Sequence, residues 1–345
     1  MIRPRPWLDR ITPYRPGRQA LTAAGSMASN ESPIGASPRV AAAVSEAVTG
    51  AHHYPDPLAT DLRQRLAELH EVSVEHILVG NGSDELIFLL AWAYLAHGGQ
   101  AVCADPAYRV DEISSQVVDA RLIKIPLRNW THDLQAMADV AADIAYVVNP
   151  HNPTGTTLGR QEIESFVARA QSRLVVIDEA YIDFTDDPAA TSAIPLARQG
   201  KAAVLRTFSK VYGLAGLRIG YLVADPAIIH TLRTVRAPFS VGGLAQTAAL
   251  AALEDHTHYQ AVRRHTVQHR AALTDLFTSA GYDVVPSQAN FVLVRTEDED
   301  QLVARLAEHG VSVRPGSALG APGTVRISVP SRPGMALVEQ ALAMP

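Results

Sequence analysis

The chain has 345 residues and a formal net charge of −5, with 47% hydrophobic and 19% charged residues. This composition is typical of a globular protein of about two domains and excludes a disordered chain. The charge is spread without a basic block, which argues against nucleic-acid binding, and the single cysteine, Cys103, excludes an internal disulfide. No apolar signal region or membrane-length apolar run is found, which predicts a cytoplasmic protein.

Short apolar runs alternate with helical patterns over most of the chain, after an irregular arm at residues 1–30. This alternation predicts an α/β large domain over residues 31–235, with a mostly parallel sheet flanked by helices. Strands are expected at 77–80, 101–104, 121–126, 144–148, 174–177, 202–206 and 219–224.

The remaining residues, 236–345, have a different pattern, which predicts a small α+β C-terminal domain. Helices are expected at 243–254, 262–280 and 298–309 and at the end of the chain, and strands at 283–285, 291–294, 311–314 and 325–329.

The first segment with a chemical signal follows the strand at 77–80. Gly82, Ser83 and Asp84 form a turn that opens an apolar helix. Backbone N–H groups at such a helix start bind anions, although a simple well-capped helix would produce the same pattern.

Two later strands also end in polar residues. The strand at 144–148 runs into a turn with two Asn-Pro pairs, from which Asn152 is able to point its amide at a ligand. The strand at 174–177 ends in Asp178, followed by Tyr181. A carboxylate at the carboxyl end of a central strand lies where α/β proteins bind ligands, although a helix N-cap would also suit Asp178.

The most informative residue is Lys210, because of its neighbours. Thr207 and Ser209 supply hydroxyls beside it, and Arg218 follows a glycine-rich stretch, so the segment is suited to hold a phosphate. A lysine beside an anion site suits a covalent cofactor that carries an aldehyde and a phosphate, namely pyridoxal 5′-phosphate. Asp178 would then keep the cofactor's ring nitrogen protonated. For the lysine alone, a surface position would be the ordinary interpretation.

In this order the segments resemble those of fold-type I pyridoxal-phosphate enzymes, and among them the class I/II aminotransferases. The resemblance covers residues 25–330 and is closest to the histidinol-phosphate and aromatic aminotransferase branch. It rests on Asn30-Glu31-Ser32-Pro33, Tyr54-Pro55-Asp56-Pro57, GNGSDELI, RTFSKVYGLAGLRIGY and SQANFVLVR.

The resemblance implies a role for each matching residue toward the cofactor. Lys210 would bond its aldehyde and carry a proton, Asp178 would pair with its ring nitrogen, and Tyr181 and Asn152 would bond its O3′ oxygen. Tyr108 would stack on the ring, although core packing is the alternative. The residues implied around the phosphate are Gly82, Ser83, Asp84, Thr207, Ser209 and Arg218, together with Tyr54 donated by the neighbouring subunit of a homodimer with shared active sites.

The same resemblance implies amino-acid and 2-oxo-acid substrates. Arg326 would hold the substrate carboxylate through its planar guanidinium group. The alternative is that Arg326 is an ordinary charged residue on a half-exposed strand. Asn30 would belong to the segment that closes over the substrate. Arg314 would lie near the substrate side chain, with a surface arginine as the alternative.

Departures from the family pattern leave the donor open between an aromatic amino acid, a histidinol-phosphate-like amine and a cationic amine. Ser32 replaces an asparagine, Asp111 replaces an aromatic residue, and the stretch around Ser240 lacks an asparagine. A decarboxylase of the threonine-phosphate type would share the same cofactor residues. A regulatory protein on this fold is disfavoured, because Lys210 and Asp178 are both present. The pair His52-His53 has no cysteine or carboxylate at ligand spacing, so no metal site is expected.

Overall fold

A seven-stranded sheet forms the larger part of the structure, a computed structural model that describes residues 3–14, 17–95 and 98–343. The strand order is β1-β7-β6-β5-β4-β2-β3. The pairs among β2 to β6 are parallel, whereas β7 pairs antiparallel with both β6 and β1. The predicted α/β class and mostly parallel sheet are confirmed. The strands are β1 (Ile77–Gly80), β2 (Gln100–Asp105), β3 (Arg121–Pro126), β4 (Ile144–Val148), β5 (Leu174–Asp178), β6 (Ala203–Thr207) and β7 (Gly220–Val223).

Both faces of this sheet are buried by helices, which explains why its central strands are apolar throughout rather than alternating. Val147, Ile177 and Val204 pack in one core with α2, α6 and α10, and the intervening residues, such as Val176, pack in a second core with α3 and α9. The helices around this sheet are α1 (Pro38–Ala47), α2 (Thr60–His70), α3 (Gly82–Tyr94), α4 (Arg109–Val117), α5 (Leu134–Ala138), α6 (Arg160–Arg169), α7 (Pro188–Thr191), α8 (Ile194–Arg198), α9 (Pro226–Val235) and α10 (Gly243–Glu254).

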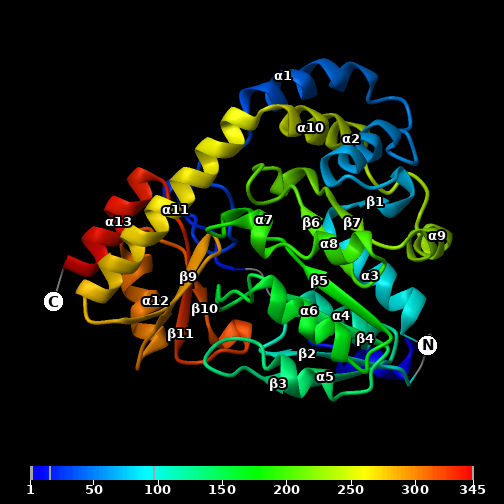
Figure 1. The fold of residues 1–345 in the computed structure, drawn as a ribbon. Coiled ribbons are helices and arrows are strands. Elements are labelled where there is room, and N and C mark those ends of the chain that lie inside the picture. Colours follow the sequence, from blue (N-terminus) through cyan, green and yellow to red (C-terminus); the bar gives the residue numbers. More distant parts are fainter. Residues whose placement is uncertain (1–2, 15–16, 96–97, 344–345) are drawn as a thin grey trace.

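A second, four-stranded antiparallel sheet has the order β10-β11-β9-β8. Figure 1 shows the long helix α11 running from α10, above the large sheet, to this small sheet. The remaining elements are β8 (Asp283–Val285), β9 (Phe291–Arg295), β10 (Arg314–Pro315), β11 (Thr324–Ser328), α11 (His256–Ser279), α12 (Glu299–Glu308) and α13 (Arg332–Ala343).

Two element boundaries in this region differ from the expectation. Helix α11 begins at His256 instead of residue 262, because the Asp255 side chain accepts a hydrogen bond from the His258 backbone N–H and caps an earlier start. The strand expected at 311–314 is reduced to β10. Ser312, in the first part of the expected strand, pairs instead with the N-terminal segment through a parallel bridge to Ser26.

The N-terminal arm is not purely extended, and its described part lies on its own chain. It contains two short 3₁₀ helices, η1 (Pro6–Arg10) and η2 (Ala23–Gly25). The Trp7 indole N–H donates to the Val117 carbonyl at 3.1 Å, and Arg10 pairs with Asp119 at 2.7 Å. This part of the arm therefore contacts α4 and the residues just after it within the same chain.

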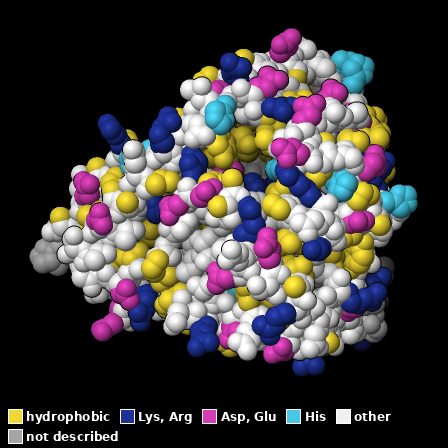
Figure 2. Space-filling view, viewed as in Figure 1, with side chains coloured by type: hydrophobic (Ala, Val, Ile, Leu, Met, Phe, Trp, Pro, Cys, Tyr) yellow, Lys and Arg dark blue, Asp and Glu magenta, His cyan; other side chains and the backbone are white. Residues whose placement is uncertain are grey.

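The division into an arm, a large domain and a C-terminal domain stays a proposal. The buried alanines of α10 lie in the core of the large sheet, although residues 243–254 fall within the predicted C-terminal domain at 236–345. On the face seen in Figure 2, basic and acidic side chains are interspersed. Among the described residues, no helix combines the length and the apolar character needed to cross a membrane.

Candidate active site

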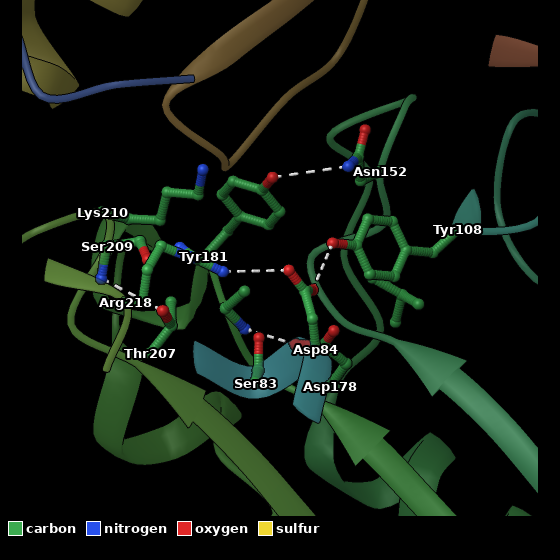
Figure 3. Close-up of a pocket in the computed structure, with 12 residues that line it drawn as sticks. Ser83, Asp84, Tyr108, Asn152, Asp178, Tyr181, Thr207, Ser209, Lys210 and Arg218 are labelled. Atoms are coloured by element: carbon green, nitrogen blue, oxygen red, sulfur yellow. Dashed lines mark hydrogen bonds and ion pairs between the residues drawn. The ribbon is translucent and has the colours of Figure 1, made fainter. Parts of the chain in front are cut away.

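A pocket lies at the carboxyl ends of the parallel strands, where the polar segments picked out from the sequence meet (Figure 3). The register of β4 and β5 pairs Val148 with Asp178, so the strand ends are level and their following loops face one space. The lining residues are Ser83, Asp84, Tyr108, Val148, Asn152, Asp178, Ala180, Tyr181, Thr207, Ser209, Lys210 and Arg218.

Asp178 supplies a buried carboxyl at the floor of the pocket, only 6% exposed. Its pKa is raised to about 7, mainly by burial and also by the nearby Asp84 and Glu179, whereas a hydrogen bond from the Ala180 backbone N–H at 2.9 Å and the charge of Lys210 oppose this rise. A positive group placed against Asp178 would therefore stabilise its ionised form strongly.

Lys210 extends into the pocket from the loop after β6. Burial, and then the positive charge of Arg326, lower the pKa of its amine to about 8. The amine donates a hydrogen bond of 3.4 Å to the Ser29 carbonyl and lies 5.6 Å from the centre of the Tyr181 ring. A lysine with this pKa is partly neutral near pH 8, which is the form that attacks carbonyl carbons and accepts protons.

The opposite end of the pocket is built for an anion. Gly82 has a positive φ of 73°, and a Cβ there would lie 2.6 Å from Arg218 Nη2, so glycine lets the guanidinium lie across the start of α3. Asp84 pairs with Arg218 at 3.0 Å and accepts a hydrogen bond from the Tyr108 hydroxyl at 2.9 Å. The Asp84 side chain thus orients two other pocket residues, a role that the sequence did not suggest.

The threonine and serine of the Lys210 segment line this same end. The Thr207 hydroxyl accepts a hydrogen bond from the Ser209 backbone N–H at 3.0 Å, and both residues are buried. This bond fixes the turn between β6 and Lys210 and leaves the Ser209 hydroxyl beside Arg218 in the pocket lining.

A hydrogen-bonded chain crosses from the large sheet to the small one above Lys210. The Tyr181 hydroxyl accepts from the side-chain amides of Asn30 at 3.1 Å and Asn152 at 3.4 Å. Arg326 donates to Asn152 Oδ1 at 2.7 Å and to the Ala28 carbonyl at 2.7 Å. Asn30, with a left-handed φ of 56°, is fixed by Ser328 and Asn290. Neither Ser328 nor Asn290 was singled out from the sequence.

A wider cavity of about 840 Å³ continues from this pocket and includes Asn30, Arg314 and Arg326 in its lining. Arg314 and Arg326 are directly paired residues of β10 and β11, and each is only 6% exposed. The Arg326 Nε is buried with no hydrogen-bond partner among the described residues. Buried polar atoms are normally paired, so this nitrogen indicates a place for an anionic ligand. The segment 317–320 and Tyr14, both missed from the sequence, also line the cavity.

Tyr54 is the one predicted cofactor contact that lies apart from the pocket of its own chain. It is 83% exposed and stacks on Phe239, with ring centres 4.7 Å apart. The structure describes a single chain, so the predicted donation of Tyr54 to a neighbouring subunit stays a prediction.

Asp111 corrects one expectation about the substrate. Its neighbours Val110 and Glu112 line the wider cavity, but Asp111 does not line it and is 1% exposed. Its Oδ2 has no hydrogen-bond partner among the described residues. Burial, and then the carboxylates of Asp178, Asp84 and Glu112, raise its pKa well above the ordinary range. Asp111 is enclosed and outside the cavity lining, so it is not placed to contact a cationic donor, and its raised pKa favours the protonated form.

We therefore expect Asp111→Asn to stabilise the protein near neutral pH. The folded chain keeps the Asp111 proton above pH 4, where the unfolded chain releases it, so this group makes the free energy of unfolding fall as pH rises towards its folded pKa. Asparagine has the same shape and does not titrate. Denaturant unfolding should be measured from pH 4 to 8 for both proteins. The free energy of unfolding of the variant should fall with pH less steeply than that of the parent, by up to about 1.4 kcal/mol per pH unit. The same pH dependence in variant and parent would contradict a protonated Asp111 in the folded chain.

The pocket fits the cofactor that the sequence predicts. It holds a buried acid for a ring nitrogen, an amine of lowered pKa for an aldehyde and a helix start with Arg218 for a phosphate. Tyr108 lines both the pocket and the wider cavity, and its stacking on the cofactor ring stays a prediction. The described residues contain no cluster of three or more His, Cys, Asp or Glu side chains suited to a metal ion.

Comparisons with known proteins agree with this geometry. The family model for aminotransferase class I and II matches residues 26–343. A histidinol-phosphate aminotransferase of Brevibacillus brevis is 38% identical over 330 residues, covering 92% of this chain and 91% of the relative. Among solved structures, histidinol-phosphate aminotransferase from Sinorhizobium meliloti, in complex with pyridoxal-5′-phosphate, has a TM-score of 0.90 at 28% identity, covering 99% of this chain and 97% of its own. L-threonine-O-3-phosphate decarboxylase from Porphyromonas gingivalis has a TM-score of 0.80 at 26% identity, with 92% and 98% covered.

Proposed function

Because this chain belongs to the class I and II aminotransferases, we propose that it transfers the amino group of a phosphorylated amine of the histidinol-phosphate type to a 2-oxo acid. The chain is a pyridoxal-5′-phosphate-dependent aminotransferase. The cytoplasmic location expected from the sequence remains a prediction.

Different pocket residues would have different roles in transamination. When bound, pyridoxal 5′-phosphate supplies an electron-withdrawing ring that stabilises negative charge at the substrate carbon. Asp178 would hold the proton on the ring nitrogen, because a buried carboxylate is strongly stabilised by a positive partner placed against it. Lys210 would carry the proton to and from the substrate carbon, and its lowered pKa allows both directions near neutral pH.

The two paired arginines are the observation that supports a phosphorylated donor. Arg314 and Arg326 lie side by side at one register, and both line the cavity that opens onto Lys210. Two guanidinium groups match the charge of a phosphate ester, and the same pair would bind the carboxylates of a 2-oxo acid. The names of the similar proteins point to the same donor.

A donor screen tests this proposal. The protein loaded with cofactor is mixed, without an acceptor, with histidinol phosphate, histidinol, each aromatic amino acid and phosphothreonine. We expect the absorbance of the cofactor to change to that of its amine form fastest with histidinol phosphate, and a 2-oxo acid to reverse the change. A faster reaction with an aromatic amino acid would replace the proposed donor, and release of CO₂ from phosphothreonine without an amine form would indicate decarboxylation.

A homodimer with shared sites is the second part of the proposal. It is supported by Tyr54, an 83% exposed tyrosine held in place by stacking on Phe239. Two-fold homodimers are also the commonest oligomers of soluble proteins. Tyr54 of each subunit would reach the cofactor phosphate of its partner.

Tyr54→Phe is then expected to weaken cofactor retention by roughly 0.5–1.5 kcal/mol, or by up to about 3 kcal/mol because the hydrogen bond that is lost would be to a charged phosphate. The cofactor dissociation constant, measured by equilibrium dialysis, checks this value. Mixed dimers of Tyr54→Phe and Lys210→Ala subunits should contain one intact site and regain activity. A fully active monomer, or confirmed mixed dimers without recovery, would contradict the shared site.

A further inference from the structure

Helix α11 directs one row of polar side chains at the segment that follows Tyr181. Tyr259, Arg263 and Arg270 recur at helical spacing, so they lie on one face of the helix. The Arg263 guanidinium donates to the carbonyls of residues 183, 185 and 186 at 2.9, 2.7 and 2.8 Å. Arg270 donates to the carbonyl of residue 184 at 3.0 Å. Four consecutive backbone carbonyls are therefore bound by two arginines of one helix.

This segment has two further polar contacts from outside α11: Gln288 Oε1 accepts a hydrogen bond from the Asp186 backbone N–H at 3.0 Å, and Arg206 pairs with Asp183 at 3.7 Å. It contains only the 3₁₀ turn η5 (Ile182–Phe184), and residues 182–184 are buried. Buried carbonyl groups that lose their hydrogen-bond donors are costly, so the arginines determine where this stretch of backbone lies. Tyr181 immediately precedes this segment, so the position of the Tyr181 ring depends on where the backbone of residues 182–186 lies.

Arg270 also joins the two parts of the structure behind the pocket. The same Nη1 atom donates to the Phe184 carbonyl and to the Ala289 carbonyl, each at 3.0 Å. Phe184 lies three residues after Tyr181, and Ala289 lies two residues before Phe291. The Tyr181 and Phe291 rings meet edge to face, with centres 5.2 Å apart. Arg270 thus fixes the spacing of two backbone segments whose aromatic side chains are in contact.

The apolar residues between these segments form one small core cluster. Val262 of α11 packs in it with Tyr181, Phe184 and Phe291, and with Val211, the residue next to Lys210. The Tyr259 hydroxyl adds a bond of 2.9 Å to Asp183 Oδ1. The helix therefore contacts the immediate neighbours of the pocket residues from behind and contributes no side chain to the pocket itself.

We propose that Arg263 and Arg270 are positioning residues that set the Tyr181 hydroxyl for its bond to the cofactor. The inference rests on the proposed role of Tyr181. The hydroxyl lies 3.1 Å from Asn30 Nδ2 and 3.4 Å from Asn152 Nδ2, so a small shift of its backbone would change the length and angle of every bond it makes. Hydrogen bonds weaken steeply with such changes.

The test measures the pH midpoint at which the visible absorbance of the lysine-bound cofactor changes. A hydroxyl that donates to the ring oxygen O3′ stabilises negative charge there and so favours the deprotonated form. Tyr181→Phe should raise the midpoint by about 1 pH unit, the size expected for one hydrogen bond. Arg270→Met should raise it by about half as much, and Arg270→Lys, which keeps an N–H donor, should raise it less.

Arg305→Met is the matched control. Arg305 of α12 also donates to two backbone carbonyls, those of Ala341 and Leu342 at 2.6 and 3.1 Å, but it lies away from the pocket. This variant should lose thermal stability with an unchanged midpoint, because the protein loses the same kind of contact without a link to Tyr181. If Arg270→Met does not fold, Arg263→Met takes its place in every comparison.

A double-variant cycle decides whether the arginine acts through the tyrosine. In a Tyr181→Phe background, Arg270→Met should add no further shift, because the hydroxyl that it positions is gone. If the shifts of the two substitutions add, or if the midpoint does not move in Arg270→Met, the positioning role of the arginines is wrong, while the proposed role of Tyr181 is unaffected. An unmoved midpoint in Tyr181→Phe would overturn the proposed role of Tyr181 and this inference with it, and the donor screen would still test the reaction independently.

Discussion

Lys210→Ala is expected to lower turnover by at least about 10⁴-fold, the largest effect of any single substitution in this chain. The alanine removes both the amine that bonds the cofactor and the group that moves the substrate proton. No other lysine is available to replace it, because the only others are Lys124 and Lys201, and neither lines the pocket around Asp178. The variant should still bind the cofactor weakly through Arg218 and the start of α3.

Borohydride reduction followed by peptide mapping checks this assignment directly. The reduced label should appear on the peptide that contains Lys210 and be absent from the variant. Lys124→Ala and Lys201→Ala serve as matched controls, since Lys124 lines the wider cavity and Lys201 is exposed. With three lysines in the chain, a label on either of the other two would be unambiguous and would refute the assignment.

Asp178→Asn is expected to reduce turnover by at least about 10²-fold while the cofactor remains bound. The amide has the shape of the carboxyl group but lacks the negative charge that would hold a proton on the ring nitrogen. Burial already raises the pKa of Asp178 to about 7, so its charge depends on a positive partner such as a protonated ring. Steady-state kinetics, together with the absorbance of the bound cofactor, separate lost turnover from lost binding.

Asp178→Glu is the comparison that isolates charge from shape. It keeps the carboxylate and alters its reach, so it should retain more activity than the asparagine variant if charge is the important property. Turnover close to that of the parent protein in Asp178→Asn would show that the carboxylate has another role.

The sequence was most informative where function resides in short segments. Asp178 ends an apolar strand, and Lys210 and Asn152 lie in the short loops that follow two others, so a local pattern was enough to place them at one edge of a sheet. The fold class was predictable for the same reason, because buried parallel strands are continuous apolar runs.

Contacts between distant segments were not predictable in this way. Arg326 and Asn152 are 174 residues apart, and Arg263 and Arg270 bind backbone carbonyls, which have no side-chain signature in the sequence. The orientation of Asp111 depends on the rotation of α4 about its axis, and that rotation is set by packing. The pairing of Ser312 with Ser26 similarly required the path of the N-terminal segment.

That N-terminal segment has a practical consequence for protein engineering. Three successive residues serve the active site: the Ala28 carbonyl accepts from Arg326, the Ser29 carbonyl accepts from Lys210, and Asn30 donates to Tyr181. An expression design that trims the chain at residue 30 to remove an apparently dispensable leader would delete all three of these hydrogen bonds.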